Sequence, residues 1–171
     1  MKNKKKKVTA VISVVIILVV AWIAFCGYEW GWGPFLKLHN HKTAALPGNA
    51  EAYSLDKAEV IDDSPLKGKK IAFLGSSVTY GASSMGVSFA DYIGAENDCE
   101  TVKEAVSGTT LVDEGIGSYI SRLNKMKDRD VDIFVCQLST NDATQKKELG
   151  KVIESKNIDD FDTKTVAGAI E

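Results

Sequence analysis

The sequence predicts an α/β fold: an incomplete parallel sheet of about three strands in a three-layer α/β/α arrangement, preceded by one N-terminal transmembrane helix. Two observations predict this organisation. Residues 8–28 carry no charge and are dominated by valine and isoleucine. Residues 69–171 alternate between short apolar runs and segments with helical spacing, and this alternation is typical of a parallel sheet with helices on its faces.

Length and composition restrict the class of protein further. The 171 residues are 44% hydrophobic and 26% charged, with only three prolines, which excludes collagen-like, disulfide-scaffold and wholly disordered chains. Five of the 21 basic residues lie within residues 1–7, so 16 basic and 23 acidic residues remain in the rest of the chain. Because nucleic-acid phosphates require a basic surface, this acidic body predicts that nucleic acid is not a partner.

The apolar run is long enough to cross a membrane. At about 1.5 Å per residue, residues 8–28 span roughly 30 Å, the thickness of the hydrocarbon core. The lysines of residues 1–7 precede the run and Glu29 follows it. The positive-inside rule therefore predicts a single-pass protein of the cell membrane, with a basic cytoplasmic tail at 1–7 and an extracytoplasmic domain.

Two other interpretations of this segment remain open. A cleaved signal peptide has an apolar run of about 7–15 residues and a small-x-small cleavage site, whereas this run offers only Ala24-Phe25-Cys26. A lipid-modified Cys26 would require a small residue before it, and Phe25 is large. We therefore expect an uncleaved anchor, with cleavage and lipidation as the alternatives.

Residues 29–68 are expected to form a juxtamembrane stalk and linker, since glycine, proline and charges mix there without sustained periodicity. His39 and His41 lie in this stretch without a cysteine or carboxylate at metal-ligand spacing, so we expect neither to bind metal or act in catalysis. No other segment has metal spacing. Residues 75–86 lack the Lys-Ser/Thr ending of a phosphate-binding loop, and we expect no cofactor.

The folded domain is expected to cover residues 69–171. Apolar runs predict strands and apolar residues at helical spacing predict helices. In chain order these are a strand at 70–75, a helix at 87–95, a strand at 101–106, a helix at 113–127 and a strand at 131–138.

Small polar residues follow each predicted strand. They are GSSVT at 75–79, SGT at 107–109 and TND at 140–142. Ligands bind outside the carboxyl ends of parallel strands, where a hydroxyl, a peptide N–H and a side-chain amide would meet, as acyl transfer requires. Each segment alone could be an ordinary turn or helix cap. Their occurrence at three successive strand ends favours a site.

Three segments also resemble a known family. IAFLGSSVTYG at 71–81, AVSGTT at 105–110 and LSTND at 138–142 are similar, in order and at plausible spacing, to the first three conserved blocks of the SGNH (GDSL-type) hydrolases, which are serine esterases and lipases. The resemblance covers about residues 70–145. It implies a flavodoxin-like α/β/α fold, hydrolysis of ester bonds, and as substrate an ester-bearing small molecule, lipid or acylated polysaccharide.

The resemblance implies three site residues. Ser77 matches the nucleophile, Gly108 the glycine whose N–H serves the oxyanion hole, and Asn141 the asparagine whose side-chain amide completes that hole. The N–H of Ser77 would be a third donor. Ser76 stands where the family most often has aspartate, which removes a charge beside the nucleophile but leaves the nucleophile in place.

One part of the expected machinery is missing. A serine hydroxyl needs a base, which the family supplies from an Asp-x-x-His block near its C-terminus, and no histidine follows Ser77 in this sequence. We therefore expect a truncated, inactive fragment of such a hydrolase. The alternative is an anchored, non-catalytic binding or interaction protein that retains the α/β fold. A third interpretation, a flavodoxin-like cofactor binder, requires a tightly bound chromophore.

Two structural expectations follow from the domain prediction. Cys99, in a predicted loop, and Cys136, in an apolar strand, are expected to be free thiols. With only three strands in place, the strand at 133–136 is expected to have an unpaired apolar edge that favours aggregation.

Overall fold

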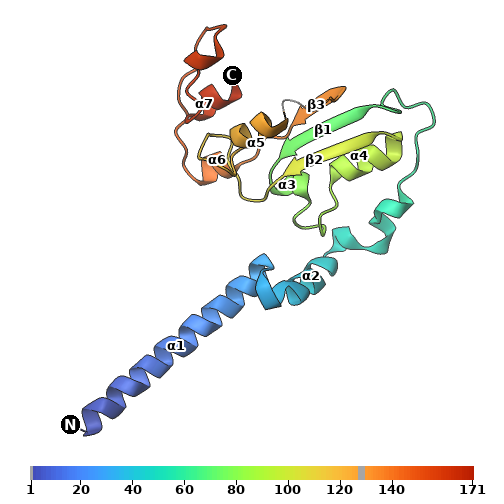
Figure 1. The fold of residues 1–171 in the computed structure, drawn as a ribbon. Coiled ribbons are helices and arrows are strands. Elements are labelled where there is room, and N and C mark those ends of the chain that lie inside the picture. The colour runs from blue at the N-terminus through green and yellow to red at the C-terminus, as the bar shows by residue number, and fades with distance from the viewer. Residues whose placement is uncertain (1, 127–129) are drawn as a thin grey trace. The chain divides into compact units, whose positions relative to one another are not determined.

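The computed structural model describes residues 2–126 and 130–171 (Figure 1). The chain forms two compact units, Met1–Ala50 and Glu51–Glu171. The first unit contains the apolar N-terminal run, and the second contains the sheet with its covering helices.

Helix α1 (Lys2–Trp30) contains the whole apolar run. Its portion Lys6–Trp30 has a mean hydropathy of 2.9, and none of the apolar window is buried against the described protein. The predicted helix is therefore present, and it is long and apolar enough to cross a membrane, a property that it shares with signal sequences.

Helix α2 (Leu36–Ala44) follows a short 3-10 turn, Gly33–Phe35, and packs on the end of α1. The Nδ1 atom of His39 lies 3.0 Å from the carbonyl oxygen of Tyr28. The Lys42 ammonium lies 2.7 Å from the Glu29 carboxylate. The sequence analysis expected no element here, because α2 is polar on most sides and buries only Thr43. The unit ends in a second 3-10 turn, Pro47–Asn49.

The sheet has three parallel strands in the order β2-β1-β3. Strand β1 (Lys70–Gly75) lies in the centre, between β2 (Glu100–Ala105) and β3 (Ile133–Cys136). Ile71 of β1 is in register with Thr101 of β2 and Ile133 of β3. The predicted incomplete parallel α/β sheet is confirmed.

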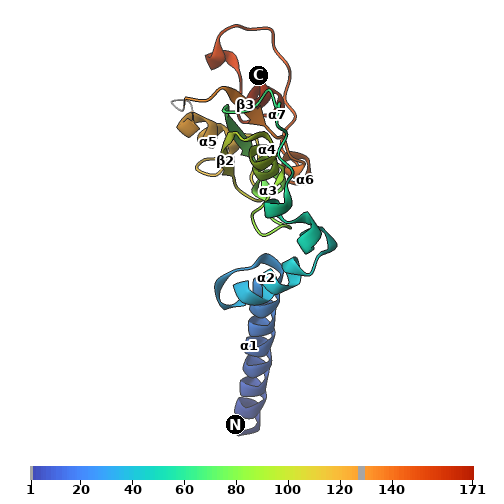
Figure 2. The ribbon, with the colours of Figure 1, turned by 90° about the vertical axis from the view of Figure 1, so that its right-hand side faces the viewer.

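Helices cover both faces of β1 and produce three layers (Figure 2). On one face, Ala72 and Leu74 pack with Tyr119 of α5 (Tyr119–Met126). On the other face, Ile71 and Phe73 pack with Ala90 of α4 (Phe89–Asn97). The remaining helices are short: α3 (Ser77–Tyr80), α6 (Asn141–Thr144) and α7 (Val166–Ile170), with 3-10 turns at Glu51–Tyr53, Leu55–Lys57 and Ile158–Asp160.

Helix α5 begins six residues later than the spacing predicts. Gly115 has a φ of +95°, which ends any helical path there. The hydroxyl of Ser118 accepts a hydrogen bond from the N–H of Ser121 at 3.2 Å and caps the helix. Ile116, expected on the buried face, is 87% exposed. Residues 106–118 are therefore a long loop, and this loop carries one of the predicted site segments.

Residues 51–68, which the sequence analysis assigned to the linker, pack with the sheet unit instead. The N–H of Ile61 donates to the Glu96 carbonyl at 2.7 Å, and the N–H of Gly68 donates to the Asp98 carbonyl at 2.9 Å. Ser64 is buried and donates its hydroxyl to the Asn97 side chain at 2.5 Å. These bonds fix the segment along α4, so the compact unit begins at Glu51 rather than at Lys69.

The two edges of the sheet differ in chemistry. Strand β2 carries three charged residues, Glu100, Lys103 and Glu104, as protected edge strands do. Strand β3 carries none, pairs in the described structure with β1 alone, and leaves Phe134 44% exposed. Cys136 is exposed as well, and all three cysteines are free thiols.

We expect a lysine at position 134 to reduce self-association of residues 51–171. Phe134→Lys places a charge on the unpaired apolar edge, and because the side chain is already half exposed, the free energy of unfolding should change by less than about 1 kcal/mol. Light scattering and size-exclusion chromatography measure the effect. Leu123→Lys, on exposed α5 surface away from the edge, is the matched control. Equal association of both variants and the wild type would contradict the prediction.

Candidate functional site

The first strand end places Ser77 at the start of α3, half-buried, directly after β1. A Cβ atom at Gly75 would lie 1.9 Å from the Thr79 hydroxyl oxygen, so only glycine permits this tight entry into the helix. Gly81 then ends α3 with a φ of +83°. The peptide N–H of Ser77 lies in the first turn of a helix, where N–H groups have no intrahelical acceptor, and it is available to a ligand.

The second strand end places Gly108 in a left-handed turn, with a φ of +79°. Its carbonyl oxygen accepts a hydrogen bond from the side-chain amide of Gln145 at 3.0 Å. The N–H of Gly108 donates to no acceptor among the described residues. The carbonyl is thus tied to the protein while the N–H remains available.

Helix α6 follows the third strand, and two of its side chains form hydrogen bonds to the loop after β2. The Asn141 amide donates one N–H to the Thr109 carbonyl at 2.7 Å. The buried Asp142 carboxylate accepts the N–H of Leu111 at 2.9 Å and that of Val112 at 3.3 Å. An asparagine amide has two N–H donors, so Asn141 keeps one for a ligand beside the Gly108 turn.

Two further hydrogen bonds connect the first strand end to the others. The N–H of Val106 donates to the Gly75 carbonyl at 3.4 Å, at the end of β2. The buried Thr79 hydroxyl donates to the Gln137 side chain at 3.0 Å, at the end of β3. The structure therefore links all three predicted segments. It joins Asn141 directly to the Gly108 loop, and it connects Ser77 to that loop through its neighbours.

The sequence analysis missed Arg122, which the structure buries beneath the loop. Its guanidinium donates to the carbonyl oxygens of Glu104 at 2.9 Å and Gly117 at 3.2 Å, and to the Thr109 hydroxyl at 2.9 Å. Burial lowers the pKa of Arg122, and the Glu104 carboxylate opposes this shift. The signal in the sequence was its position three residues after Tyr119, on the buried side of α5. Asp142 was part of the third segment, but its role was not foreseen.

Residues 51–171 contain no histidine, the residue that most often serves as the general base for a serine nucleophile. His39 and His41 belong to the other unit. In the part of the chain that the structure describes, no group of three His, Cys, Asp or Glu side chains could hold a metal ion. The strand ends thus present a serine hydroxyl, peptide N–H groups and a side-chain amide, and no histidine occurs in this unit.

Ser76 is the one described residue whose buried side-chain polar atom has no hydrogen-bond partner. It is 0% exposed and lies between β1 and Ser77. A buried hydroxyl without a partner destabilises the fold. Where the resembled family has an aspartate that could accept hydrogen bonds, this chain therefore has an unsatisfied hydroxyl.

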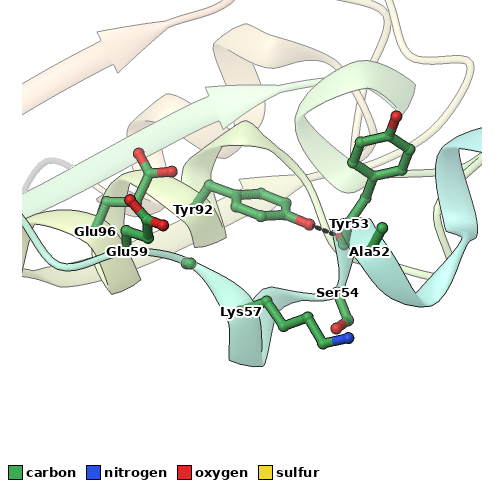
Figure 3. Close-up of a pocket in the computed structure, with 8 residues that line it drawn as sticks. Ala52, Tyr53, Ser54, Lys57, Glu59, Tyr92 and Glu96 are labelled. Atoms are coloured by element: carbon green, nitrogen blue, oxygen red, sulfur yellow. Dashed lines mark hydrogen bonds between the residues drawn. The ribbon is translucent and has the colours of Figure 1, made fainter.

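A separate cavity of about 370 Å³ lies between α4 and the segment that precedes β1 (Figure 3). The Tyr92 hydroxyl donates to the Tyr53 carbonyl, and Glu59 and Glu96 are among the lining residues. Neither Ser77, Gly108 nor Asn141 lines this cavity. It is therefore distinct from the strand-end site.

Comparisons with known proteins support the fold and leave the activity undetermined. No protein-family model matches the sequence, and no curated protein matches it. One crystal structure is similar, with a TM-score of 0.52 and 21% sequence identity. The alignment covers 63% of this chain and 49% of that one, so this chain spans about half the length of the matched structure. At this identity the likeness shows the α/β fold alone.

We expect opposite effects on stability from removing two neighbouring buried hydroxyls. Ser76→Ala removes an unsatisfied group and should leave the free energy of unfolding unchanged or raise it by up to about 1 kcal/mol. Thr79→Val removes the partner of Gln137 and should lower it by about 1–2 kcal/mol. Urea denaturation measures both, and each variant serves as the control for the other. A larger loss in Ser76→Ala than in Thr79→Val would contradict the hydrogen bonding described here.

Proposed function

We propose that the strand-end site is the nucleophile and oxyanion hole of an SGNH-like serine hydrolase that acts on ester bonds. The observation that carries the proposal is the hydrogen bond from Asn141 to Thr109. It holds a side-chain amide against the Gly108 turn, where a peptide N–H has no acceptor among the described residues. An amide and free peptide N–H groups are donors of the kind that stabilise a tetrahedral oxyanion, and Ser77 at the start of α3 would supply the attacking hydroxyl.

The chemistry follows from this arrangement. The Ser77 oxygen attacks the ester carbonyl carbon while its proton passes to a base, and the carbonyl oxygen becomes an oxyanion. The N–H groups of Ser77 and Gly108 and the free N–H of Asn141 stabilise that charge. Collapse of the intermediate expels the alcohol and leaves an acyl-enzyme, which water hydrolyses through a second tetrahedral intermediate.

Residues 51–171 contain no histidine that could act as this base. Without a base the Ser77 hydroxyl remains a weak nucleophile, so we expect this chain to hydrolyse esters slowly. An added small base such as imidazole should therefore increase the reactivity of Ser77 toward an acylating or phosphonylating reagent.

We expect a fluorophosphonate probe to modify Ser77, and to do so faster in the presence of imidazole. Ser77→Ala should abolish the modification, and Asn141→Ala should slow it by about 10²–10³-fold, as for other oxyanion donors. Mass spectrometry of the labelled peptide identifies the site. Ser107→Ala, an exposed serine in the neighbouring loop, is the control. Undiminished labelling of Ser77→Ala would overturn the proposal.

We also propose that residues 8–28 anchor the protein in the cell membrane, with its N-terminus in the cytoplasm and the sheet unit outside. The lysines before the helix and the acid after it support this orientation. An outward-facing hydrolase would meet the esters of the cell envelope, such as lipids and acylated polysaccharides, as well as small soluble esters.

Thiol labelling tests the orientation. In a Cys99→Ser background, the exposed Cys136 should react with a membrane-impermeant maleimide in intact cells. A cysteine introduced by Lys4→Cys, with Cys136→Ser, should react only after the membrane is permeabilised. The reverse pattern would place the sheet unit in the cytoplasm.

The second candidate is an anchored, non-catalytic binding protein with the same fold. The lack of any histidine after Ser77 favours it. In that case Ser77 would show no reactivity above that of other half-buried serines, with or without imidazole.

A further inference from the structure

Two buried side chains of opposite charge hold the loop after β2 from its two sides. Arg122 is 2% exposed and Asp142 is 6% exposed. Arg122 comes from α5 and reaches the Thr109 hydroxyl, while Asp142 comes from α6 and reaches the N–H groups of Leu111 and Val112. Both charges therefore act on one segment, residues 108–112.

Among the described residues neither charge forms a salt bridge, and the Glu104 carboxylate acts on Arg122 only at longer range. The Arg122 guanidinium donates to two main-chain carbonyls and one hydroxyl, and the Asp142 carboxylate accepts main-chain N–H groups. Burial of an unpaired charge is unfavourable unless hydrogen bonds replace its hydration. The Arg122 bond to Thr109 and the Asp142 bonds to Leu111 and Val112 go to residues 108–112. The other two Arg122 bonds go to the carbonyls of Glu104 and Gly117. Part of the desolvation of both groups is therefore offset by contacts that require the present conformation of this loop.

Thr109 is the point on which these contacts meet. Its hydroxyl accepts from Arg122 and donates to the Val106 carbonyl at 2.8 Å. Its carbonyl accepts the amide of Asn141. With the Gly108 carbonyl held by Gln145, the peptide groups on both sides of Thr109 are fixed in orientation, and the N–H of Gly108 has no acceptor within the described part of the chain.

We propose that Arg122 and Asp142 are positioning residues that preorganise residues 108–112 as an anion-binding loop. The inference rests on the proposed function, in which this loop stabilises an oxyanion. Preorganised donors are effective because the protein does not reorganise when the charge develops.

The test uses the full chain in detergent and two independent measurements. Hydrogen–deuterium exchange of the peptides that cover residues 106–118 reports the rigidity of the loop. The rate of fluorophosphonate modification of Ser77 reports the anion-stabilising function. Arg122→Met and Asp142→Asn should each accelerate exchange in this segment and slow the modification by about 10- to 100-fold, the range for residues that act through others.

Two more variants separate positioning from general stability. Lys103→Met removes a half-buried cation that bonds Asp91 and the Gly86 carbonyl, away from the loop. It should lower the melting temperature without changing loop exchange or the Ser77 rate at low temperature. Thr109→Val removes only the hydroxyl between Arg122 and Val106, so it keeps the test valid if either charge variant fails to fold, and it should reproduce their effects in weaker form.

The outcomes distinguish this inference from the proposed function. Unchanged exchange of residues 106–118 in Arg122→Met, Asp142→Asn and Thr109→Val overturns the positioning role, whatever the labelling rate. The positioning role is also overturned if Lys103→Met slows the labelling of Ser77 as much as the charge variants do at equal melting temperature. If the wild type shows no labelling of Ser77 at all, the hydrolase proposal fails, and the exchange measurement alone decides whether the two charges preorganise the loop.

Discussion

The hydrogen bonds from α6 to the loop after β2 are the interaction on which the candidate site depends. Parallel strands end at the same edge of a sheet, but the loops that follow them can take many conformations. Here Asn141 and Asp142, adjacent on one short helix, bind three successive main-chain groups of that loop, namely the Thr109 carbonyl and the N–H groups of Leu111 and Val112. These hydrogen bonds join the segment after β3 to the loop after β2.

In the proposed function, the chemistry available at these strand ends is one half of an acyl-transfer site. A serine at the start of a helix, a glycine in a left-handed turn and a side-chain amide supply a nucleophile and oxyanion donors. Residues 51–171 contain no histidine to accept the serine proton. Stabilisation of an oxyanion and activation of a nucleophile are separate physical tasks, so a protein can retain the first without the second.

The sheet shows a similar asymmetry between its two sides. Strand β1 is buried on both faces because β2 and β3 flank it and helices cover it. Strand β3 has an apolar composition typical of a strand buried on both faces, yet Phe134 and Cys136 are exposed. Strand β3 therefore has the composition of a buried strand but lies at an exposed edge, whereas the charged residues of β2 are typical of an edge strand.

The sequence by itself determined the apolar N-terminal helix, the parallel three-stranded sheet and the three polar strand ends. These features depend on local composition and on periods of 2 and 3.6 residues, which a linear pattern contains. Only the tertiary structure decided that residues 51–68 pack along α4, that Ile116 lies outside α5, and that Arg122 and Asp142 act on one loop. The first and last of those outcomes depend on hydrogen bonds between residues far apart in the chain, and such pairings leave no periodic signal in the sequence. The position of Ile116 depends on the backbone conformation of Gly115 and on the Ser118 cap, which override the helical spacing.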